Sequence, residues 1–286
     1  MLRNNIIIGL ACLAATAALS VPPKKALRSA KGDLILPNPN VLRHVGRPFI
    51  NALADFYWIQ TSHALGIAIQ PADYMNVYHY GDLVTRLDPD FCYAYQFVGQ
   101  AIPVNTGGLR GWKNVDESTE IMERGLRACP NNANERLLLS FNYSHFYKRY
   151  KDAADTLAPL VGLPGTVEYI PKLVTRLYAQ AGDTGTALQL AEALYETAEY
   201  EDEREAYAAR VLEIRLEQVL QTVENAQAAF LAREGRHPAD VQELVSSHDL
   251  PGVPEDPFGG KIYLSAEDHR AYSSEQQKRL EVNFVP

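Results

Sequence analysis

The sequence lacks the residue patterns that mark the common catalytic and cofactor sites. It contains no G-x-S-x-G, no P-loop, no G-x-G-x-x-G and no H-E-x-x-H. None of its seven histidines stands beside clustered carboxylates, so we expect no bound metal and no cofactor. We therefore predict a protein that is not an enzyme. A hydrolase whose site is assembled from scattered residues is the alternative.

The chain also has few cysteines and carries no net positive charge. The cysteines are Cys12, Cys92 and Cys129, with no C-x-x-C spacing, which argues against a zinc site or a thioredoxin-like motif. The formal net charge is −8, and an acidic chain repels phosphate backbones. We expect no nucleic-acid partner.

No acidic residue occurs before Asp33, and this N-terminal stretch is typical of a targeting segment. A predominantly apolar run spans residues 6–19 and is followed by Lys24, Lys25, Arg28 and Lys31. Its length fits a secretory signal better than a full span, which needs about 20 residues. We predict that residues 1–32 form a signal peptide or a membrane anchor with a basic flank. If uncleaved, residues 6–21 would contact the membrane; a buried helix of a soluble domain is the remaining alternative. The predicted location is the bacterial envelope, inner membrane-anchored or periplasmic.

Residues 33–52 contain Pro37 and Pro39 and are predicted to form a linker and entry segment. Beyond them the apolar spacing is helical, and strand-like alternation is scarce until the C-terminus. Proline followed by Asp or Asn ends two of the predicted helices, at Pro89 and Pro130. Residues of similar type recur at an offset of 34: Pro130 and Pro164, Ala153 and Ala187, Leu157 and Ala191, Leu160 and Leu194, and Ser144 and Tyr178.

This period, with Tyr178 nine residues before Ala187 and a Gly182-Asp183 turn between them, resembles the tetratricopeptide repeat. Ala54-Asp55-Phe56-Tyr57-Trp58 is similar to a stretch in membrane-anchored bacterial repeat proteins. The resemblance implies an all-α fold in which residues 53–202 form a right-handed superhelix of stacked helical hairpins. It also implies structural roles in the repeats for Pro89, Gly99, Pro130, Ala153, Tyr178, Gly182 and Ala187. One unit needs extra residues, which we place at residues 105–108.

Cys92 and Cys129 fall at the start of the first helix and the end of the second helix of one predicted hairpin. Those two ends lie close together in a helical hairpin. Outside the cytoplasm a disulfide would clamp the hairpin. The alternative is a pair of small buried apolar side chains.

Residues 203–286 are predicted to form a long capping helix and a small C-terminal module. An apolar stripe of period 3.5 within residues 212–230 either packs on the last repeat or forms an oligomer interface: Leu212, Leu216, Val219, Val223, Ala226 and Phe230. A short helix is expected at residues 239–245, and residues 262–264 and 271–273 are expected to pair as a hairpin. Gly235-Arg236-x-Pro238 and the turn at residues 256–260 resemble the C-terminal part of type II secretion pseudopilins. The resemblance covers residues 223–263 and does not extend to the N-terminus.

A cluster of aromatic and basic residues is the predicted partner-binding site: Tyr143, Phe146, Tyr147, Arg149 and Tyr150, with Tyr178. Core packing is the alternative role for these side chains. We predict an interaction scaffold that holds a peptide or helix of another protein in the concave face of the repeats. An accessory role in a type II secretion or type IV pilus-like assembly is the second interpretation.

Overall fold

The computed structural model describes residues 34, 36–107 and 111–280. In these residues nearly all regular structure is helical, and the strands form two short hairpins, so the prediction of an all-α fold is confirmed. The predicted N-terminal targeting segment lies outside the described residues. Within the described ranges, no helix is both long enough and apolar enough to cross a membrane.

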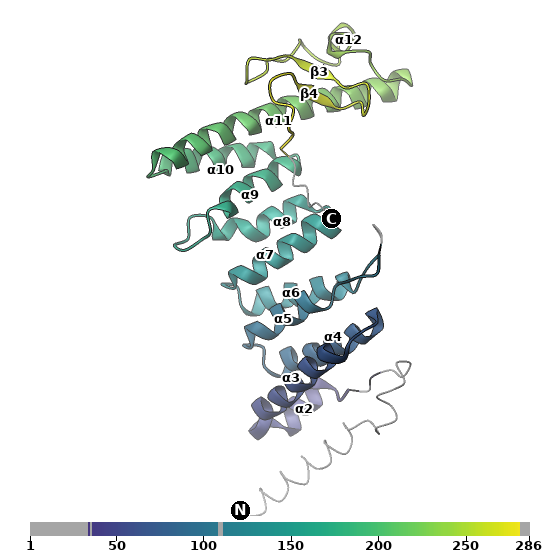
Figure 1. The fold of residues 1–286 in the computed structure, drawn as a ribbon, viewed down its shortest axis with the longest axis vertical. Coiled ribbons are helices and arrows are strands. Elements are labelled where there is room, and N and C mark those ends of the chain that lie inside the picture. The colour runs from purple at the N-terminus through teal and green to yellow at the C-terminus, as the bar shows by residue number, and fades with distance from the viewer. Residues whose placement is uncertain (1–33, 35, 108–110, 281–286) are drawn as a thin grey trace, which may run out of the picture. The chain divides into compact units, whose positions relative to one another are not determined.

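The chain divides into two compact units, residues 1–139 and residues 140–286. In the first unit, helices that follow one another in sequence pack side by side, α3 on α4, α4 on α5 and α5 on α6 (Figure 1). A two-stranded hairpin, β1 (Val104–Asn105) with β2 (Trp112–Lys113), stands where we placed the extra residues. The helical elements of this unit are α2 (Pro39–Val45), η2 (Arg47–Phe49), α3 (Ile50–Ile67), α4 (Pro71–Leu87), α5 (Cys92–Ala101), α6 (Val115–Ala128) and the start of α7 (Ala133–Phe141).

Helix α2 and η2 lie within residues 33–52, the predicted linker and entry segment. Pro39 is the first residue of α2, where its missing N–H costs nothing, and the Asn38 side chain accepts a hydrogen bond from the Asn40 N–H. Helix α3 then begins at Ile50 rather than Leu53. The prolines therefore mark a helix start in this segment.

Small residues allow the helices of the first unit to approach closely. A Cβ atom at Gly99 of α5 would lie 2.5 Å from the Met122 Cγ on α6. The Ser118 hydroxyl of α6 donates to the Gly99 carbonyl at 2.6 Å and is fully buried. Pro89 lies between α4 and α5, and Pro130 lies between α6 and α7.

In the second unit, α8 packs on α9, α9 on α10 and α10 on α11. Gly182, with φ of +81°, makes the turn between α9 and α10, and the Asp183 side chain caps α10 by accepting from the Thr186 N–H. Ala153 on α8 and Ala187 on α10 are fully buried. The helical elements of this unit are η3 (Asn142–Phe146), α8 (Tyr150–Leu157), η4 (Ala158–Leu160), α9 (Tyr169–Gln180), α10 (Thr184–Thr197), α11 (Glu201–Glu234) and α12 (Val241–Ser246).

The C-terminal module packs on the second half of α11. Strands β3 (Ile262–Leu264) and β4 (Ala271–Ser273) pair antiparallel at the predicted positions. They share one core with α12 and with four members of the predicted stripe, Leu216, Val223, Ala226 and Phe230. The same chain therefore covers most of that stripe, while Leu212 stays 37% exposed.

Candidate functional site

Two of the six predicted partner-binding residues belong to the core of the second unit. Tyr143 is buried, and the Arg149 guanidinium lies 4.7 Å from the centre of its ring. Tyr178 is also buried, and its hydroxyl donates to Asp155 Oδ1 at 2.7 Å. Burial and the neighbouring Asp155 carboxylate raise the pKa of Tyr178. These two tyrosines stabilise the helix stack and contribute little surface to a partner.

The other four predicted residues lie at the surface where the chain leaves α7. Phe146, Tyr147 and Tyr150 are half-buried and Arg149 is exposed, with its Nε donating to Asp152 Oδ2 at 2.7 Å. The segment has π-helical geometry through Phe146 and a left-handed residue at Lys148, where φ is +57°. Single π-helical turns are frequent at functional sites. The structure thus brings four predicted residues onto one turn that is partly exposed.

Helix α3 in the first unit carries a surface that the sequence analysis did not identify. Its buried residues, Ala54, Tyr57, Thr61 and Ala64, are spaced by three and four and pack inward toward α4. The opposite face consists of Phe56, Ile59, His63 and Ile67, also spaced by three and four; we name these four residues the α3 face.

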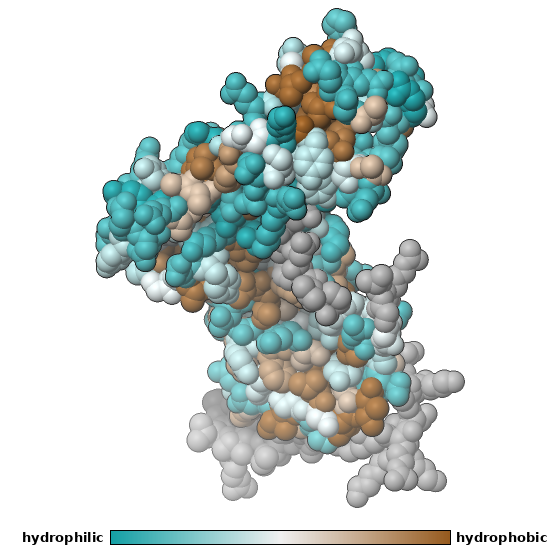
Figure 2. Space-filling model, turned by 45° about the horizontal axis from the view of Figure 1, so that its top comes forward, coloured by the Kyte–Doolittle hydropathy of each residue, from teal (hydrophilic) through white to brown (hydrophobic). Residues whose placement is uncertain are grey.

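The side chains of the α3 face are exposed although most are apolar. Phe56 is 40% exposed, Ile59 is 63% exposed and Ile67 is 53% exposed. A helix that is apolar on all sides is normally buried on all sides. Figure 2 shows that apolar residues reach the surface in patches bordered by hydrophilic ones. The sequence feature that could have revealed this surface is that apolar residues occur on both faces of this helix.

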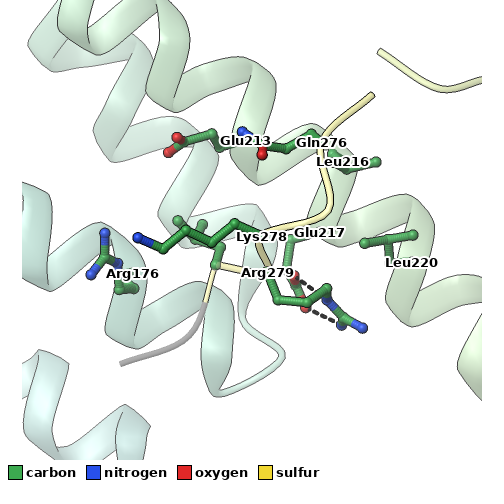
Figure 3. A pocket seen from close by; sticks show the side chains of 9 residues that line it. Arg176, Glu213, Leu216, Glu217, Leu220, Gln276, Lys278 and Arg279 are labelled. Carbon is green, nitrogen blue, oxygen red and sulfur yellow. Dashed lines mark hydrogen bonds and ion pairs between the residues drawn. The ribbon is translucent and has the colours of Figure 1, made fainter. Parts of the chain in front are cut away.

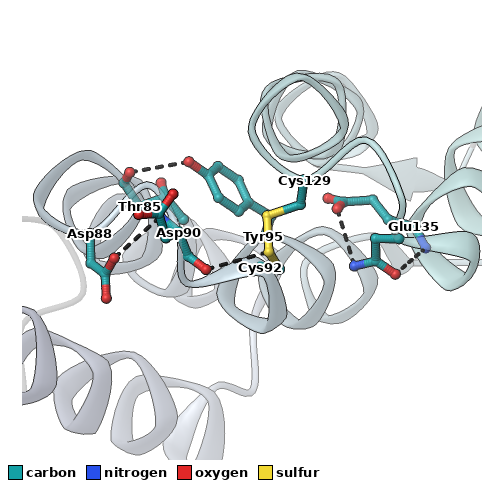
Figure 4. The surroundings of a disulfide bond; sticks show 8 residues. Thr85, Asp88, Asp90, Cys92, Tyr95, Cys129 and Glu135 are labelled. Atoms are coloured by element: carbon teal, nitrogen blue, oxygen red, sulfur yellow. Dashed lines mark hydrogen bonds between the residues drawn. A yellow bond between two sulfur atoms is a disulfide. The ribbon is translucent and has the colours of Figure 1, made fainter.

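A disulfide joins Cys92 and Cys129, with 5.8 Å between their Cα atoms (Figure 4). The bond links the first residue of α5 to the C-cap residue of α6. These are the two helix ends that we expected to lie close together in the predicted hairpin. Of the two alternatives for this pair, the structure has the disulfide. It ties neighbouring helices of the first unit covalently.

A buried carboxyl, Glu135, lies in the first turn of α7 near this disulfide (Figure 4). Its Oε2 accepts from Asn132 Nδ2 at 3.4 Å, whereas the buried Oε1 faces Gly125 and has no hydrogen-bond partner. Burial raises the pKa of Glu135 to about 8. This carboxyl therefore holds its proton at neutral pH.

The described residues include no group of three or more His, Cys, Asp or Glu side chains placed to hold a metal ion. A comparison of the sequence with models of protein families and with curated proteins finds no match.

Proposed function

We propose that this chain is a non-enzymatic protein–protein interaction scaffold of the bacterial cell envelope. In this proposal its hairpins stack in the manner of tetratricopeptide repeats and form a right-handed superhelix. A partner protein binds on the stack through a peptide or a helix. The α3 face is one contact surface, in the first unit. The aromatic turn at residues 146–150 is a separate one, in the second unit.

The observation that carries the proposal is the apolar character of α3 on both sides. Each exposed apolar side chain of the α3 face would release about 1 to 2 kcal/mol if a partner covered it, at roughly 25 cal/mol per Å² of buried apolar area. Contiguous exposed apolar surface on a soluble domain commonly marks a binding site. A partner with its own apolar stripe, such as an amphipathic helix, fits this surface best.

The disulfide supports an envelope location. Disulfides form and persist in oxidising compartments and are rare in the cytoplasm of most organisms. The Cys92–Cys129 bond joins two helices that also pack against each other, so it is part of the folded unit. The predicted targeting segment at residues 1–32 agrees with export.

Site-specific photocrosslinking in cells that naturally express the chain tests the proposal. A photoreactive phenylalanine analogue is placed at Ile59, within the α3 face, or at Ser62, which is exposed on the same helix outside that face. We expect a discrete crosslinked protein from position 59 and little or none from position 62. Equal crosslinking at both positions, or none at position 59, would contradict the proposal.

The C-terminal module favours a second candidate, an accessory role in secretion or pilus assembly. Val253 is 52% exposed and Tyr263 is 41% exposed on this module. Deleting the module would uncover the apolar stripe of α11, so substitution of these two surface residues is the cleaner test. Loss of secretion or piliation in the V253D/Y263D variant, with the α3 face unchanged, would favour this candidate over the first.

A further inference from the structure

A small pocket in the second unit lies between α9, α11 and the C-terminal segment (Figure 3). Its volume is about 70 Å³, whereas about 10–15 Å³ is enough for one water molecule on this measure. The pocket therefore has room for a small polar group. Its charged lining residues are Arg176, Glu213, Glu217, Lys278 and Arg279.

One cation of the pocket is already neutralised. Arg279 donates to Glu217 Oε1 at 2.7 Å and to Glu224 Oε1 at 2.6 Å, and its side chain is only 6% exposed. Figure 3 shows its guanidinium turned toward Glu217. This buried ion pair anchors the C-terminal segment on α11 and leaves Arg279 unavailable for a ligand.

Two further cations of the pocket lack an acidic partner in the part of the chain that the structure describes. Within the described ranges, no carboxylate lies within 4 Å of the charged groups of Arg176 or Lys278. The Arg176 Nε is buried without a hydrogen-bond acceptor. Figure 3 shows the Lys278 side chain extending toward Arg176, which places two positive groups on one side of the pocket. A buried donor left without an acceptor costs about 1 to 3 kcal/mol.

A third arginine, Arg210, pairs with the lining residue Glu213. Arg210 is 8% exposed and forms an ion pair with Glu213 at 2.9 Å, yet its Nε and Nη1 lack well-aligned acceptors. Burial lowers the pKa of Arg210; the Glu213 carboxylate opposes this and the charge on Arg176 adds to it. The positive charges of Arg210 and Arg176 thus oppose each other.

The charge balance of the lining indicates the kind of anion. Three cationic side chains line the pocket, Arg176, Lys278 and Arg279, against two acidic ones, Glu213 and Glu217. Glu224 pairs with Arg279 and Arg210 pairs with Glu213, so with these direct partners there are four cations against three acids. The formal net charge is +1, which matches a singly charged group better than a phosphate dianion. Guanidinium groups bind planar carboxylates through paired hydrogen bonds. We infer that this pocket is a binding site for a carboxylate group, held by Arg176 and Lys278, supplied by a small organic acid or an acidic residue of a bound peptide.

Nuclear magnetic resonance of the full 286-residue chain, labelled with ¹⁵N, tests this inference. The Nε–Hε signals of Arg176 and Arg210 are followed while sodium acetate, a glutamate-containing peptide with blocked termini, or sodium phosphate is added, with chloride matching the ionic strength. We expect a saturable shift of both signals with either carboxylate. Tighter binding of the peptide would identify a protein source, and equal or tighter binding of acetate would identify a small acid.

Variants separate this site from general charge effects. Arg176→Gln or Lys278→Gln should weaken acetate binding about tenfold, as expected for the loss of one charged hydrogen bond. Lys278 is exposed, so its replacement should leave the fold intact, and Lys261→Gln removes an exposed lysine of the same unit as the control. Two results would overturn the assignment: tighter binding of phosphate than of acetate, or equal binding by all variants.

Discussion

Replacing the buried acid Glu135 by glutamine should stabilise the first unit at neutral pH. The pKa of this carboxyl is about 8 in the folded chain and 4.5 as a free side chain. At a pH between these two pKa values, the unfolded chain has released the proton whereas the folded chain retains it. The free energy of unfolding therefore falls as the pH rises. At about 1.4 kcal/mol per pH unit, the penalty at pH 7 is about 3 kcal/mol, and it is absent near pH 4.

Glu135→Gln has no carboxyl to ionise at this position and should escape the penalty. The variant should match the native chain near pH 4 and exceed it by up to about 3 kcal/mol at pH 7. Both tryptophans, Trp58 and Trp112, lie in the first unit, so tryptophan fluorescence during urea unfolding reports on that unit.

Asp55→Asn removes an exposed carboxylate of the same unit and is the matched control for the loss of one charge. If the difference between Glu135→Gln and the native chain stayed constant from pH 4 to pH 8, the reasoning about this buried acid would be refuted.

Three further substitutions test the packing. Replacing both Cys92 and Cys129 by alanine removes a covalent link between residues 37 positions apart. The free energy of unfolding should fall by about 4 kcal/mol, measured by urea unfolding with tryptophan fluorescence. Gly99→Ala forces a methyl group against α6 and should lower the free energy of unfolding by about 2 kcal/mol. Gly185→Ala, at a site with open space, should raise it by about 0.5 kcal/mol. Arg279→Gln leaves the buried Glu217 without its ion-pair partner and should lower the unfolding free energy of the second unit by about 3 kcal/mol in circular-dichroism melts; an unchanged melt would contradict the anchoring role.

The helical architecture was predictable because its signals are local in the sequence. Apolar spacing marked the helices, Gly182-Asp183 marked a turn and cap, and Gly235 ends α11 in the left-handed conformation, with φ of +71°. The start of α2 at Pro39, inside the predicted linker and entry segment, was harder to predict because proline occurs both in linkers and at the first position of helices.

The functional features were less predictable because they depend on contacts between distant residues. The Oε1 of Glu135 lacks a hydrogen-bond partner because of how α6 and α7 pack. From the sequence alone, a glutamate side chain is expected to be exposed to solvent. Tyr143 and Tyr178 were expected to bind a partner, but the helix stack buries them. The α3 face escaped notice because apolar spacing identifies a helix without showing which side a neighbour covers.

The central claim is that a partner protein binds the α3 face. The most direct measurement is the affinity of the partner captured by crosslinking for three purified chains: the native chain, Ile59→Asp and the control Ser62→Asp. The account predicts that Ile59→Asp weakens binding at least about tenfold, as for an apolar contact residue, while Ser62→Asp has little effect. Equal affinities of all three chains would contradict it.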